Sequence, residues 1–566
     1  MQVIYGRDYQ ILPDSEECQI ERICRMFSEH PENTRFVLET GVYHFYKNNG
    51  IKRRFSVSNS DQADELSIAI LLEHMHDVVI DGQGAQFIFH GDMTPIVVTD
   101  CRQVELKRFS IDFAIPMSAE ARILKVQEDF VDIYLDSELF PHVIQEEQLW
   151  FERGFGEKAP LFAAMEFDGQ TNRVPEGKGD TFPKVRAFQR EKDVVRLTGI
   201  FSVMPTPGNT LVLRHGKRIH PGMLVQCSED VLVEAVTVHQ TAGLGILFQF
   251  NKNISVYKVA FSPNTVRGCR FLNGHDDGLH FSNNCGKIQV KQCSFRGLMD
   301  DAVNVHGTAA CVLTKKDWHT LIGSFCHPQS VGFERWAKKG DEIAFLDPSD
   351  RSCYTTAIVS AYRLLSPTEF ELCTEKELPE HLQPKDALEN LTNTPEVNIS
   401  DSYFGSHRAR GILVTTPKAV RIEQNIFESS GAAILLAGDV NEWYESGSCK
   451  GVLIKGNRFL HCCTSKYQFC DGVIHSEPGV KEGKDAIVHE NIRIEDNVFF
   501  LDSAALLYAD HTADVTLKGN FIFRSRKTEN PKLILQKCRN ILYEENIIDT
   551  VDSRDCFQIG EERETW

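Results

Sequence analysis

A repeat of 24 residues constrains the fold of this chain more than any other feature of its sequence. It lies in GCRFLNGHDDGLHFSNNCGKIQVKQCSFRGLMDDAVNVHG, residues 268–307. Each half carries an apolar strand, a turn with an Asp-Asp pair, and a strand of alternating apolar and polar residues. The matched pairs are Cys269/Cys293, Phe271/Phe295, Asp276/Asp300, Asp277/Asp301, Leu279/Val303 and Phe281/Val305. A supersecondary unit repeated at this length predicts a solenoid, in which each coil buries its apolar side against its neighbours.

The repeat brings four carboxyl groups together at one place. Adjacent strands of a sheet lie about 4.8 Å apart, so equivalent residues of successive coils stack. Like charges at this spacing cannot all ionise freely, and at least one acid should have a raised pKa. A proton donor beside an ionised base is what hydrolysis of a glycosidic bond requires. Asp-Asp pairs also form ordinary turns by bonding to nearby backbone, and this alternative stays open.

Similar coils are indicated on both sides of the repeat. Strand-like runs occur at 2–5, 34–38, 41–46, 67–72, 78–89 and 104–113, and an amphipathic helix is expected within residues 14–29, with Asp14 or Ser15 as its cap. Such a helix would cover the first open edge of the solenoid. After the repeat, asparagines recur at corners and predict a structural amide ladder; they are Asn425, Asn457, Asn497, Asn520 and Asn546.

Two strand-rich stretches interrupt the coils. We therefore expect an all-β chain, a right-handed parallel β-helix (a pectin-lyase-like solenoid) with two inserted small β-barrel-like modules. The expected parts are an N-terminal part of the β-helix with its capping helix (1–113), a first inserted module (114–217), central coils with the aspartates (218–307), a second inserted module (308–392), and C-terminal coils (393–566).

The composition of the chain limits the classes of molecule that it could bind. A formal net charge of −19 makes nucleic acid or an anionic membrane surface a poor partner, whereas neutral sugars are compatible with it. The first residues, MQVIYGRDYQ, do not read as a signal peptide, and no run of about 18 apolar residues occurs. The 17 cysteines are odd in number, and Cys269, Cys293 and Cys311 lie in apolar patterns typical of reduced, buried thiols. A cytoplasmic protein is expected, and a homo-oligomer remains possible.

Further polar residues are expected beside the aspartates. Aligning Phe404 with Phe295 places Arg410 over Asp301, where a guanidinium would lower the pKa of that carboxyl. The alternation also stacks His280 on Asn304, and Ser282 on His306, on an outer face that could bind sugar hydroxyls. In the loop GDVNEWYESG, Trp443 offers a stacking platform and Glu445 an acceptor. Each of these residues could instead have a purely structural role.

At these residues the sequence resembles glycoside hydrolase family 110, the inverting α-1,3-galactosidases that remove terminal galactose from blood-group-B-type and related glycans. The resemblance rests on GHDDGLHF, LMDDAVNVHG and WYESG, and on the layout of a β-helix with two insertions. It implies that Asp300 is the general acid, that Asp277 and Asp301 hold the attacking water, and that Asp276 has a supporting role. It implies no cofactor. Members are often secreted, so the sequence departs from the family in showing no signal.

Inversion sets a geometric expectation. It usually needs acid and base carboxyls roughly 6.5–9.5 Å apart, and retention about 5–5.5 Å. Directly stacked acids would be too close, whereas a diagonal pair such as Asp277 and Asp300 could span the longer gap.

Three other interpretations remain open. A polygalacturonase-like hydrolase would also place aspartates on a β-helix, but neither a Gly-His-Gly nor an Arg-Ile-Lys element lies near this repeat. A β-helix lyase would need a base beside a uronate, usually with Ca²⁺. A tailspike-like carbohydrate-binding β-helix would use the acids only as acceptors. No metal is expected, because His275, His280 and His306 lack short ligand spacing.

Overall fold

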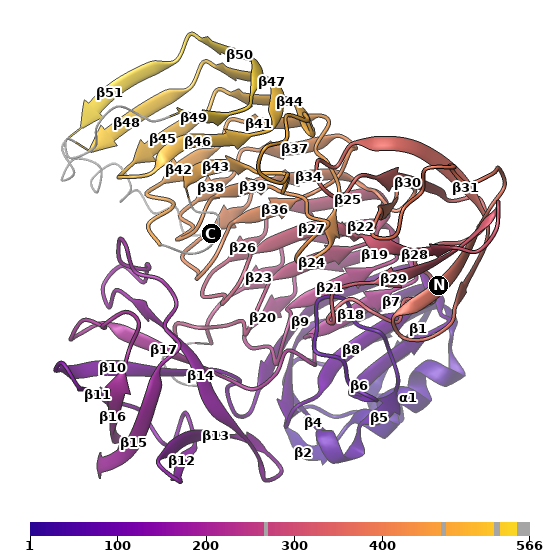
Figure 1. Ribbon diagram of the computed structural model, residues 1–566. Helices are drawn as coiled ribbons and strands as arrows, with labels where there is room; N and C mark the ends of the chain where they lie inside the picture. Colours follow the sequence, from indigo (N-terminus) through magenta and orange to yellow (C-terminus); the bar gives the residue numbers. More distant parts are fainter. Residues whose placement is uncertain (265–269, 466–470, 526–532, 552–566) are drawn as a thin grey trace.

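The computed structural model describes residues 1–264, 270–465, 471–525 and 533–551. Its main body is a parallel β-helix that runs diagonally through the molecule (Figure 1). Two sheets of 24 and 13 strands are made of coils stacked in parallel register, and two antiparallel barrels are attached to them. The expected fold class, an all-β parallel β-helix with two small barrel-like insertions, is confirmed. Cys269, one half of a predicted repeat pair, lies outside the described residues.

The first coils contain strands β1 to β9 and the helix α1. Their bounds are β1 Gln2–Tyr5, β2 Ser15–Cys18, α1 Ile20–Glu29, β3 Glu32–Val37, β4 Val42–Tyr46, β5 Ile51–Arg53, β6 Leu66–Glu73, β7 His76–His90, β8 Thr94–Thr99 and β9 Arg102–Phe113, with short 3-10 turns at Gly6–Tyr9 and Lys47–Asn49. The predicted early strands are all present. Residues 78–89 form the larger part of one long strand, β7, with a bulge between Asp81 and Ala85.

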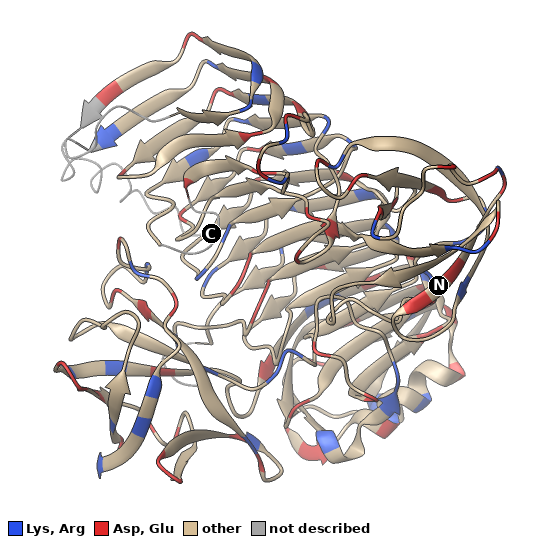
Figure 2. Cartoon of the chain, in the orientation of Figure 1, with Lys and Arg blue, Asp and Glu red and all other residues tan. Residues whose placement is uncertain are grey.

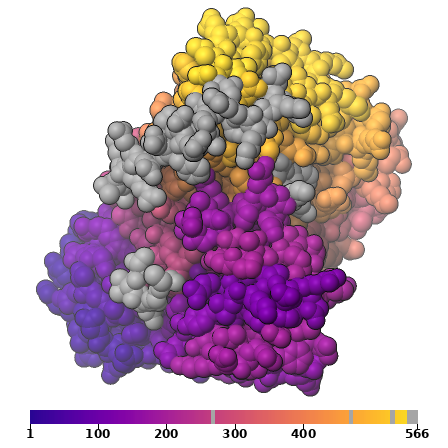
Figure 3. Space-filling model, turned by 90° about the vertical axis from the view of Figure 1, so that its left-hand side faces the viewer, coloured from indigo at the N-terminus to yellow at the C-terminus, as the bar shows by residue number. Residues whose placement is uncertain are grey.

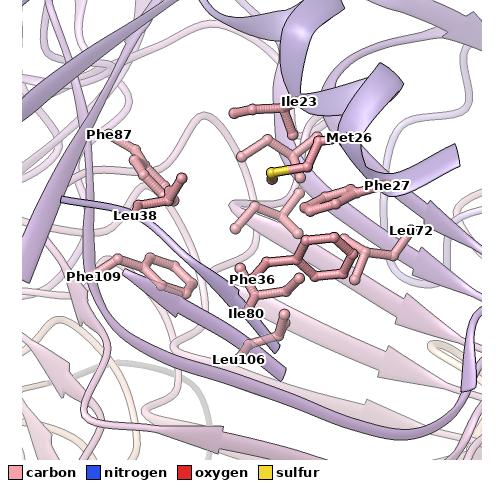
Figure 4. A pocket seen from close by; sticks show the side chains of 12 residues that line it. Ile23, Met26, Phe27, Phe36, Leu38, Leu72, Ile80, Phe87, Leu106 and Phe109 are labelled. Atoms are coloured by element: carbon pink, nitrogen blue, oxygen red, sulfur yellow. The ribbon is translucent and has the colours of Figure 1, made fainter. Parts of the chain in front are cut away.

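Helix α1 covers the end of the solenoid, but it begins later than expected. Residues 15–18 pair as strand β2, and the residue before the helix, Gln19, makes no side-chain cap. Asp14 has a left-handed backbone and instead accepts a hydrogen bond from the amide of Val42. The expected cap is therefore wrong, because the acid is used to fasten the first turn to β4. Ile23, Met26 and Phe27 point from the helix toward apolar side chains of the first coils around a small cavity (Figure 4).

The first inserted module, barrel I, is an eight-stranded antiparallel sheet. Its strands are β10 Ala119–Val126, β11 Phe130–Tyr134, β12 His142–Gln145, β13 Gln148–Gly154, β14 Glu157–Phe167, β15 Lys184–Glu191, β16 Val194–Ile200 and β17 Thr210–His215, in the order β12-β13-β14-β17-β10-β11-β16-β15. The two ends of this order approach each other, because the amide of Ala187 donates to the carbonyl of Glu147. Barrel I lies across the side of the coils (Figures 1 and 3).

The central coils follow barrel I, and the second inserted module, barrel II, follows them. The coil strands are β18 Met223–Gln226, β19 Glu229–Glu234, β20 Thr237–Val238, β21 Ile246–Gln249, β22 Lys252–Tyr257, β23 Ala260–Phe261, β24 Leu279–Ser282, β25 Cys285–Lys291, β26 Ser294–Phe295 and β27 Val303–Thr308. Barrel II is closed in the order β28-β29-β32-β31-β30-β33, with β28 Ala310–Lys315, β29 Thr320–Phe325, β30 Glu342–Leu346, β31 Cys353–Leu364, β32 Glu369–Thr374 and β33 Ala387–Asn390.

The later coils continue the same two sheets. Their strands are β34 Glu396–Ser400, β35 Tyr403–Phe404, β36 Ile412–Val414, β37 Val420–Glu423, β38 Ile426–Phe427, β39 Ile434–Leu436, β40 Glu445–Ser446, β41 Val452–Lys455, β42 Arg458–Leu460, β43 Gly472–Ser476, β44 His489–Glu495, β45 Val498–Leu501, β46 Ala505–Asp510, β47 Thr512–Lys518, β48 Phe521–Ser525, β49 Leu533–Gln536, β50 Arg539–Glu544 and β51 Ile547–Val551.

Stacked identical residues hold the coils in register. Phenylalanine rings stack from β23 to β45 with centroids 4.5 to 5.7 Å apart; they belong to Phe261, Phe295, Phe404, Phe427, Phe459 and Phe499. The predicted amide ladder is present as well. From Asn425 to Asn520, each asparagine donates through its backbone and side-chain nitrogens to the side-chain oxygen of the next rung, and Asn546 accepts from the last of them.

The charged residues are distributed over the whole fold. Basic and acidic residues are interspersed over the coils and both barrels rather than gathered in one basic face (Figure 2). The fourteen cysteines among the described residues are free thiols. Within the same residues, no helix has the length and apolar character needed to cross a membrane.

Candidate active site

The two Asp-Asp turns lie directly before strands β24 and β27, on adjacent coils. The pairing of these strands sets Leu279 against Val303 and Phe281 against Val305, as the repeat predicts. The amide of Gly278 donates to the carbonyl of Asp301, so the turns stack as well. A Cβ on Gly278 would lie 2.7 Å from the carbonyl oxygen of Ala302, and glycine here therefore allows the turns to approach closely.

Three of the four acids converge. Asp277, Asp300 and Asp301 each contribute one carboxylate oxygen to a group in which all the atoms lie within 4.8 Å of one another. The nearest oxygens of Asp277 and Asp300 are therefore closer together than the roughly 6.5–9.5 Å that separates the two carboxyl groups of most inverting enzymes.

Asp276 is separated from this group by its partners. Its Oδ1 atom lies 3.2 Å from Arg214 and 3.1 Å from Arg218, and its Oδ2 atom lies 2.7 Å from Nδ1 of His275. Burial alone would raise the pKa of Asp276, but the two guanidinium groups and His275 lower it far below the ordinary value. Asp276 is therefore a fixed carboxylate that orients arginines.

The converging acids have unequal environments. Burial and the neighbouring Asp300 raise the pKa of Asp277 well above its ordinary range. Burial raises the pKa of Asp301 to about 7. Asp300 has a side chain that is 13% exposed, whereas those of Asp277 and Asp301 are 4% and 1% exposed. Its Oδ2 atom lies 3.1 Å from Arg218, which bridges it to Asp276.

Arg410 lies over Asp301, as the register predicts. Its Nε and Nη2 atoms donate to the two carboxylate oxygens at 2.7 and 2.8 Å, and its backbone amide donates to Oδ1 at 3.1 Å. This contact lowers the pKa of Asp301, which is the expected direction, but burial outweighs it and the net pKa is raised. Both side chains are largely buried, with exposures of 10% for Arg410 and 1% for Asp301.

The polar residues of the next rung positions are buried. His280, Asn304 and His306 are 0%, 4% and 2% exposed, so they do not form the outer face that we predicted. His280 is hydrogen-bonded to Asp277 at 2.7 Å and to Nε2 of His306 at 2.8 Å. Asn304 has a buried Oδ1 atom without a hydrogen-bond partner among the described residues. The sequence alternation did not reveal this burial because segments far away in the sequence cover this rung: strand β40 pairs with the end of β27, and the Ser58 hydroxyl donates to Ser282.

That loop is fixed by Asp439, whose carboxylate accepts hydrogen bonds from the backbone amides of residues 441–444. The Trp443 side chain is 39% exposed and its ring lies against His327, with centroids 4.7 Å apart. Strand β40 then pairs antiparallel with the end of β27. This pairing places Oε1 of Glu445 3.8 Å from Nε2 of His306, and the same oxygen accepts a hydrogen bond from the side-chain Nδ2 of Asn59 at 2.6 Å.

Several residues of the site were not found by sequence reasoning. Arg214 lies on β17 of barrel I, and Arg218 follows it before the coils resume. Arg408 contacts Asp300 at 3.7 Å and is held by Asp180, from the β14–β15 loop of barrel I. These arginines lie outside the 24-residue repeat, so the spacing of the repeat cannot predict them. The alternation of Arg408 and Arg410 in SHRARG was the one usable signal.

The three converging oxygens are also spaced so that one cation could contact all of them. Carboxylate oxygens are ligands of hard cations such as Ca²⁺ or Mg²⁺. The positive charge in this site is already supplied by Arg218 and Arg410, which contact Asp300 and Asp301 directly. The arrangement suits proton transfer between acids of unequal pKa without requiring an added ion.

Comparison with known proteins agrees with this description. Residues 119–211 match the family model of GLAA-B beta-barrel domain I, and residues 320–388 match that of GLAA-B beta-barrel domain II. Alpha-1,3-galactosidase B of Bacteroides thetaiotaomicron is 35% identical over 97% of this chain and 91% of its own length. Alpha-1,3-galactosidase A of Bacteroides fragilis is 31% identical over 96% of this chain and 92% of its own length.

One solved structure illustrates how distant the structural matches are. An exopolygalacturonase from Thermotoga maritima aligns with 97% of this chain and 92% of its own, with a TM-score of 0.41 and 10% identity. Nothing about the chemistry of this chain follows from a similarity of that size.

Proposed function

The chain belongs to the α-1,3-galactosidase family, and from this premise we propose that it is an exo-acting glycosidase that hydrolyses terminal α-1,3-linked galactose by a single, inverting displacement. The substrates that we propose are linear Galα1-3Gal and the fucosylated blood-group-B-type trisaccharide. The convergence of Asp277, Asp300 and Asp301 is the observation that carries this proposal. Inverting hydrolysis needs one carboxyl group as the acid and another as the base, and this group of residues supplies both.

The exposures of the three acids support a division of roles. Asp300 is the most accessible of them, so it is the one that meets the oxygen of the leaving sugar, and we assign it as general acid. Asp277 and Asp301 lie deeper, on successive coils, and we assign them to the attacking water. In an exo-acting enzyme the leaving group lies toward solvent and the anomeric carbon lies inside, which matches this order.

The short separation of the acids is compatible with a water held between two of them. A water molecule accepts or donates hydrogen bonds at about 2.7–2.8 Å, so carboxylate oxygens within 4.8 Å can both bind the same molecule. Asp301 is a poor nucleophile because both of its oxygens accept hydrogen bonds from Arg410. We therefore favour attack by water over attack by a carboxylate, although the spacing is shorter than that of most inverting enzymes.

We propose that Trp443, Glu445 and Arg218 bind the galactose. Trp443 presents a partly exposed ring for the C–H face of the sugar, and Glu445 presents a carboxylate oxygen beside it. Arg218, 17% exposed, is a donor for a sugar hydroxyl between Asp276 and Asp300.

The experiment is a proton NMR time course with the two proposed substrates. Release of β-galactose as the first product supports inversion, and the ratio of the two rates measures the effect of the fucose branch. First release of α-galactose would overturn the single displacement. If neither substrate is cleaved while uronate polymers are, a polygalacturonase or lyase activity replaces the proposal. Binding of both without cleavage favours the carbohydrate-binding alternative.

A further inference from the structure

We propose that Asp277, His280 and His306 form a proton-storage chain, which takes the proton of Asp277 when this residue must act as the base. The inference deepens the proposed function, since it rests on Asp277 as part of the base that activates water. It assigns His280 and His306 as positioning residues that act through Asp277 and not as sugar ligands.

The chain is defined by three short contacts. Nδ1 of His306 lies 2.8 Å from the carbonyl oxygen of Gly307. Nε2 of His306 lies 2.8 Å from Nε2 of His280, and Nδ1 of His280 lies 2.7 Å from Oδ2 of Asp277. A carbonyl oxygen only accepts hydrogen bonds, so Nδ1 of His306 carries a proton.

Counting protons then fixes the charge of the chain. Each contact requires one proton between its two heavy atoms, because two facing lone pairs at such distances repel each other. Three contacts therefore hold three protons, whereas two neutral imidazoles supply two. The chain carries one proton more than a carboxylate and two neutral histidines. This result holds whether the extra proton lies on Asp277, His280 or His306.

Burial places the extra proton on Asp277 in the ligand-free site. Burial lowers the pKa of His280 to about 4 and also lowers the pKa of His306, and burial together with Asp300 raises the pKa of Asp277. When the extra proton moves to the histidines, Glu445 stabilises it there, because its carboxylate lies 3.8 Å from Nε2 of His306. Burial raises the pKa of Glu445, but both histidines lower it and the net pKa is lowered. The other charged groups that act on the chain are Arg218, Asp276, Asp300 and Asp301.

The proton balance of the reaction shows what the chain does. The extra proton first passes from Oδ2 of Asp277 to Nδ1 of His280, which leaves Asp277 ionised. The water oxygen then bonds to the anomeric carbon, and its proton passes to Asp277. The bond from the anomeric carbon to the leaving oxygen breaks with its electron pair on that oxygen, which takes the proton of Asp300. When the products leave, the second extra proton of the chain moves through solvent water to Asp300, and the site is restored.

The first test needs no activity. In full-length protein labelled with ¹⁵N-histidine, two-bond proton–nitrogen correlations report which ring nitrogens carry protons. We expect a proton on Nδ1 of His306 and a far-downfield, slowly exchanging proton on the contact between His280 and Asp277, lost in His280→Asn. Finding Nδ1 of His306 without a proton would overturn the chain. This result stands even if no galactoside is cleaved, so it fails separately from the proposed function.

The second test uses pH profiles of the same variants. An asparagine at position 280 still donates to Asp277 but cannot take its proton. We expect His280→Asn to lower kcat by about 100-fold, to move the acidic limb of kcat/KM to higher pH by about one unit, and to leave KM within about threefold. His306→Gln should give a smaller change of the same kind. A raised KM with an unmoved limb would instead make His280 a sugar ligand and overturn the proposal.

A matched control is His475→Asn. His475 is a fully buried histidine on β43, further along the same sheet, and its Nε2 contacts Glu477 at 3.0 Å. Its contacts with Glu477 and Tyr508 do not involve the acids, so this variant should keep the acidic limb and the far-downfield proton. Thermal unfolding of each variant separates loss of folding from loss of proton transfer.

Discussion

Asp276 and Asp277 are neighbours in the sequence with opposite electrostatic roles. Both are buried, but Asp276 is surrounded by Arg214, Arg218 and His275, whereas Asp277 faces Asp300 and a histidine of low pKa. The guanidinium groups stabilise the charged form of Asp276. For Asp277, the attraction of Arg218 does not offset burial and the neighbouring charge of Asp300. Two adjacent carboxyls of the same type are thereby divided into a permanent anion and a group that exchanges protons.

This division predicts opposite effects on stability. A carboxyl with a lowered folded-state pKa adds stability above its unfolded pKa of about 3.9, and this is lost as the pH falls. A carboxyl with a raised folded-state pKa costs stability that grows as the pH rises above about 3.9. At pH 7, Asp276→Asn should therefore destabilise the fold by about 3 kcal/mol, and Asp277→Asn should stabilise it by about 1 kcal/mol. Urea unfolding measures both, and equal losses would contradict the assignment.

The role of Asp300 predicts a dependence on the leaving group. Asp300→Asn removes the proton donor, so cleavage of Galα1-3Gal should fall by about 10³-fold. A p-nitrophenyl α-galactoside has a leaving group that needs no proton, and its cleavage should fall by less than about tenfold. Asp301→Asn is the matched control, because loss of the water-binding carboxylate should slow both substrates alike. The measurement is kcat for each variant on the two substrates. Equal losses on both substrates in Asp300→Asn would show that Asp300 is not the general acid.

At the scale of the coil, residues at equivalent positions of the sequence repeat stack on one another in the structure. The register of Asp277 on Asp301, the placing of Arg410 and the asparagine ladder could all be predicted, because stacked coils bring equal positions together. The burial and the hydrogen-bond partners of each side chain could not be predicted. His280 lies at the predicted rung position but is buried, and Asp14 fastens β4 instead of capping α1. Such outcomes depend on neighbours that the period does not encode.

The asparagine ladder predicts a local stability cost. The side chain of Asn497 donates to the carbonyl of Ile454 and to the next rung, and its oxygen accepts from Asn457. Asn497→Ala leaves these buried groups unpaired and should cost about 3 kcal/mol. Asn398→Ala is the control, because this exposed asparagine of β34 lies outside the ladder and should change stability by less than about 0.5 kcal/mol. Similar losses at the two positions in thermal unfolding would argue against the ladder.

At the scale of the molecule, the site is shared between the solenoid and barrel I. The barrel packs on the coils through an apolar contact in which Met165 and Phe167 meet Leu272 and Met299. Beside this contact, Arg214 reaches Asp276 from β17. The sequence repeat identifies the acids, but the cations that divide their roles come partly from an insertion. The sequence therefore predicts the insertions as separate modules, but it does not predict which of their residues contact the acids.

The ion pair of Asp180 with Arg408 tests this coupling. Asp180, on the β14–β15 loop of barrel I, accepts hydrogen bonds from the guanidinium of Arg408, which also donates to the carbonyl of Met299 and lies 3.7 Å from Asp300. In Asp180→Asn this charge loses its main counter-ion and should draw Asp300 away from the substrate. We expect kcat for Galα1-3Gal to fall by about 10- to 100-fold, with a smaller loss for the aryl galactoside.

Barrel I offers a matched pair for the control. Asp132 and Arg196 also form a two-point ion pair, at 2.7 Å for both contacts, but it joins β11 to β16 within the barrel. Asp132→Asn should lower stability slightly and leave both substrates unaffected, because nothing in that pair reaches the acids. If Asp180→Asn behaved in the same way, barrel I would support the coils mechanically without acting on Asp300. A loss confined to the natural disaccharide would instead place the inserted barrel within the catalytic machinery, since only that substrate depends on a correctly placed proton donor.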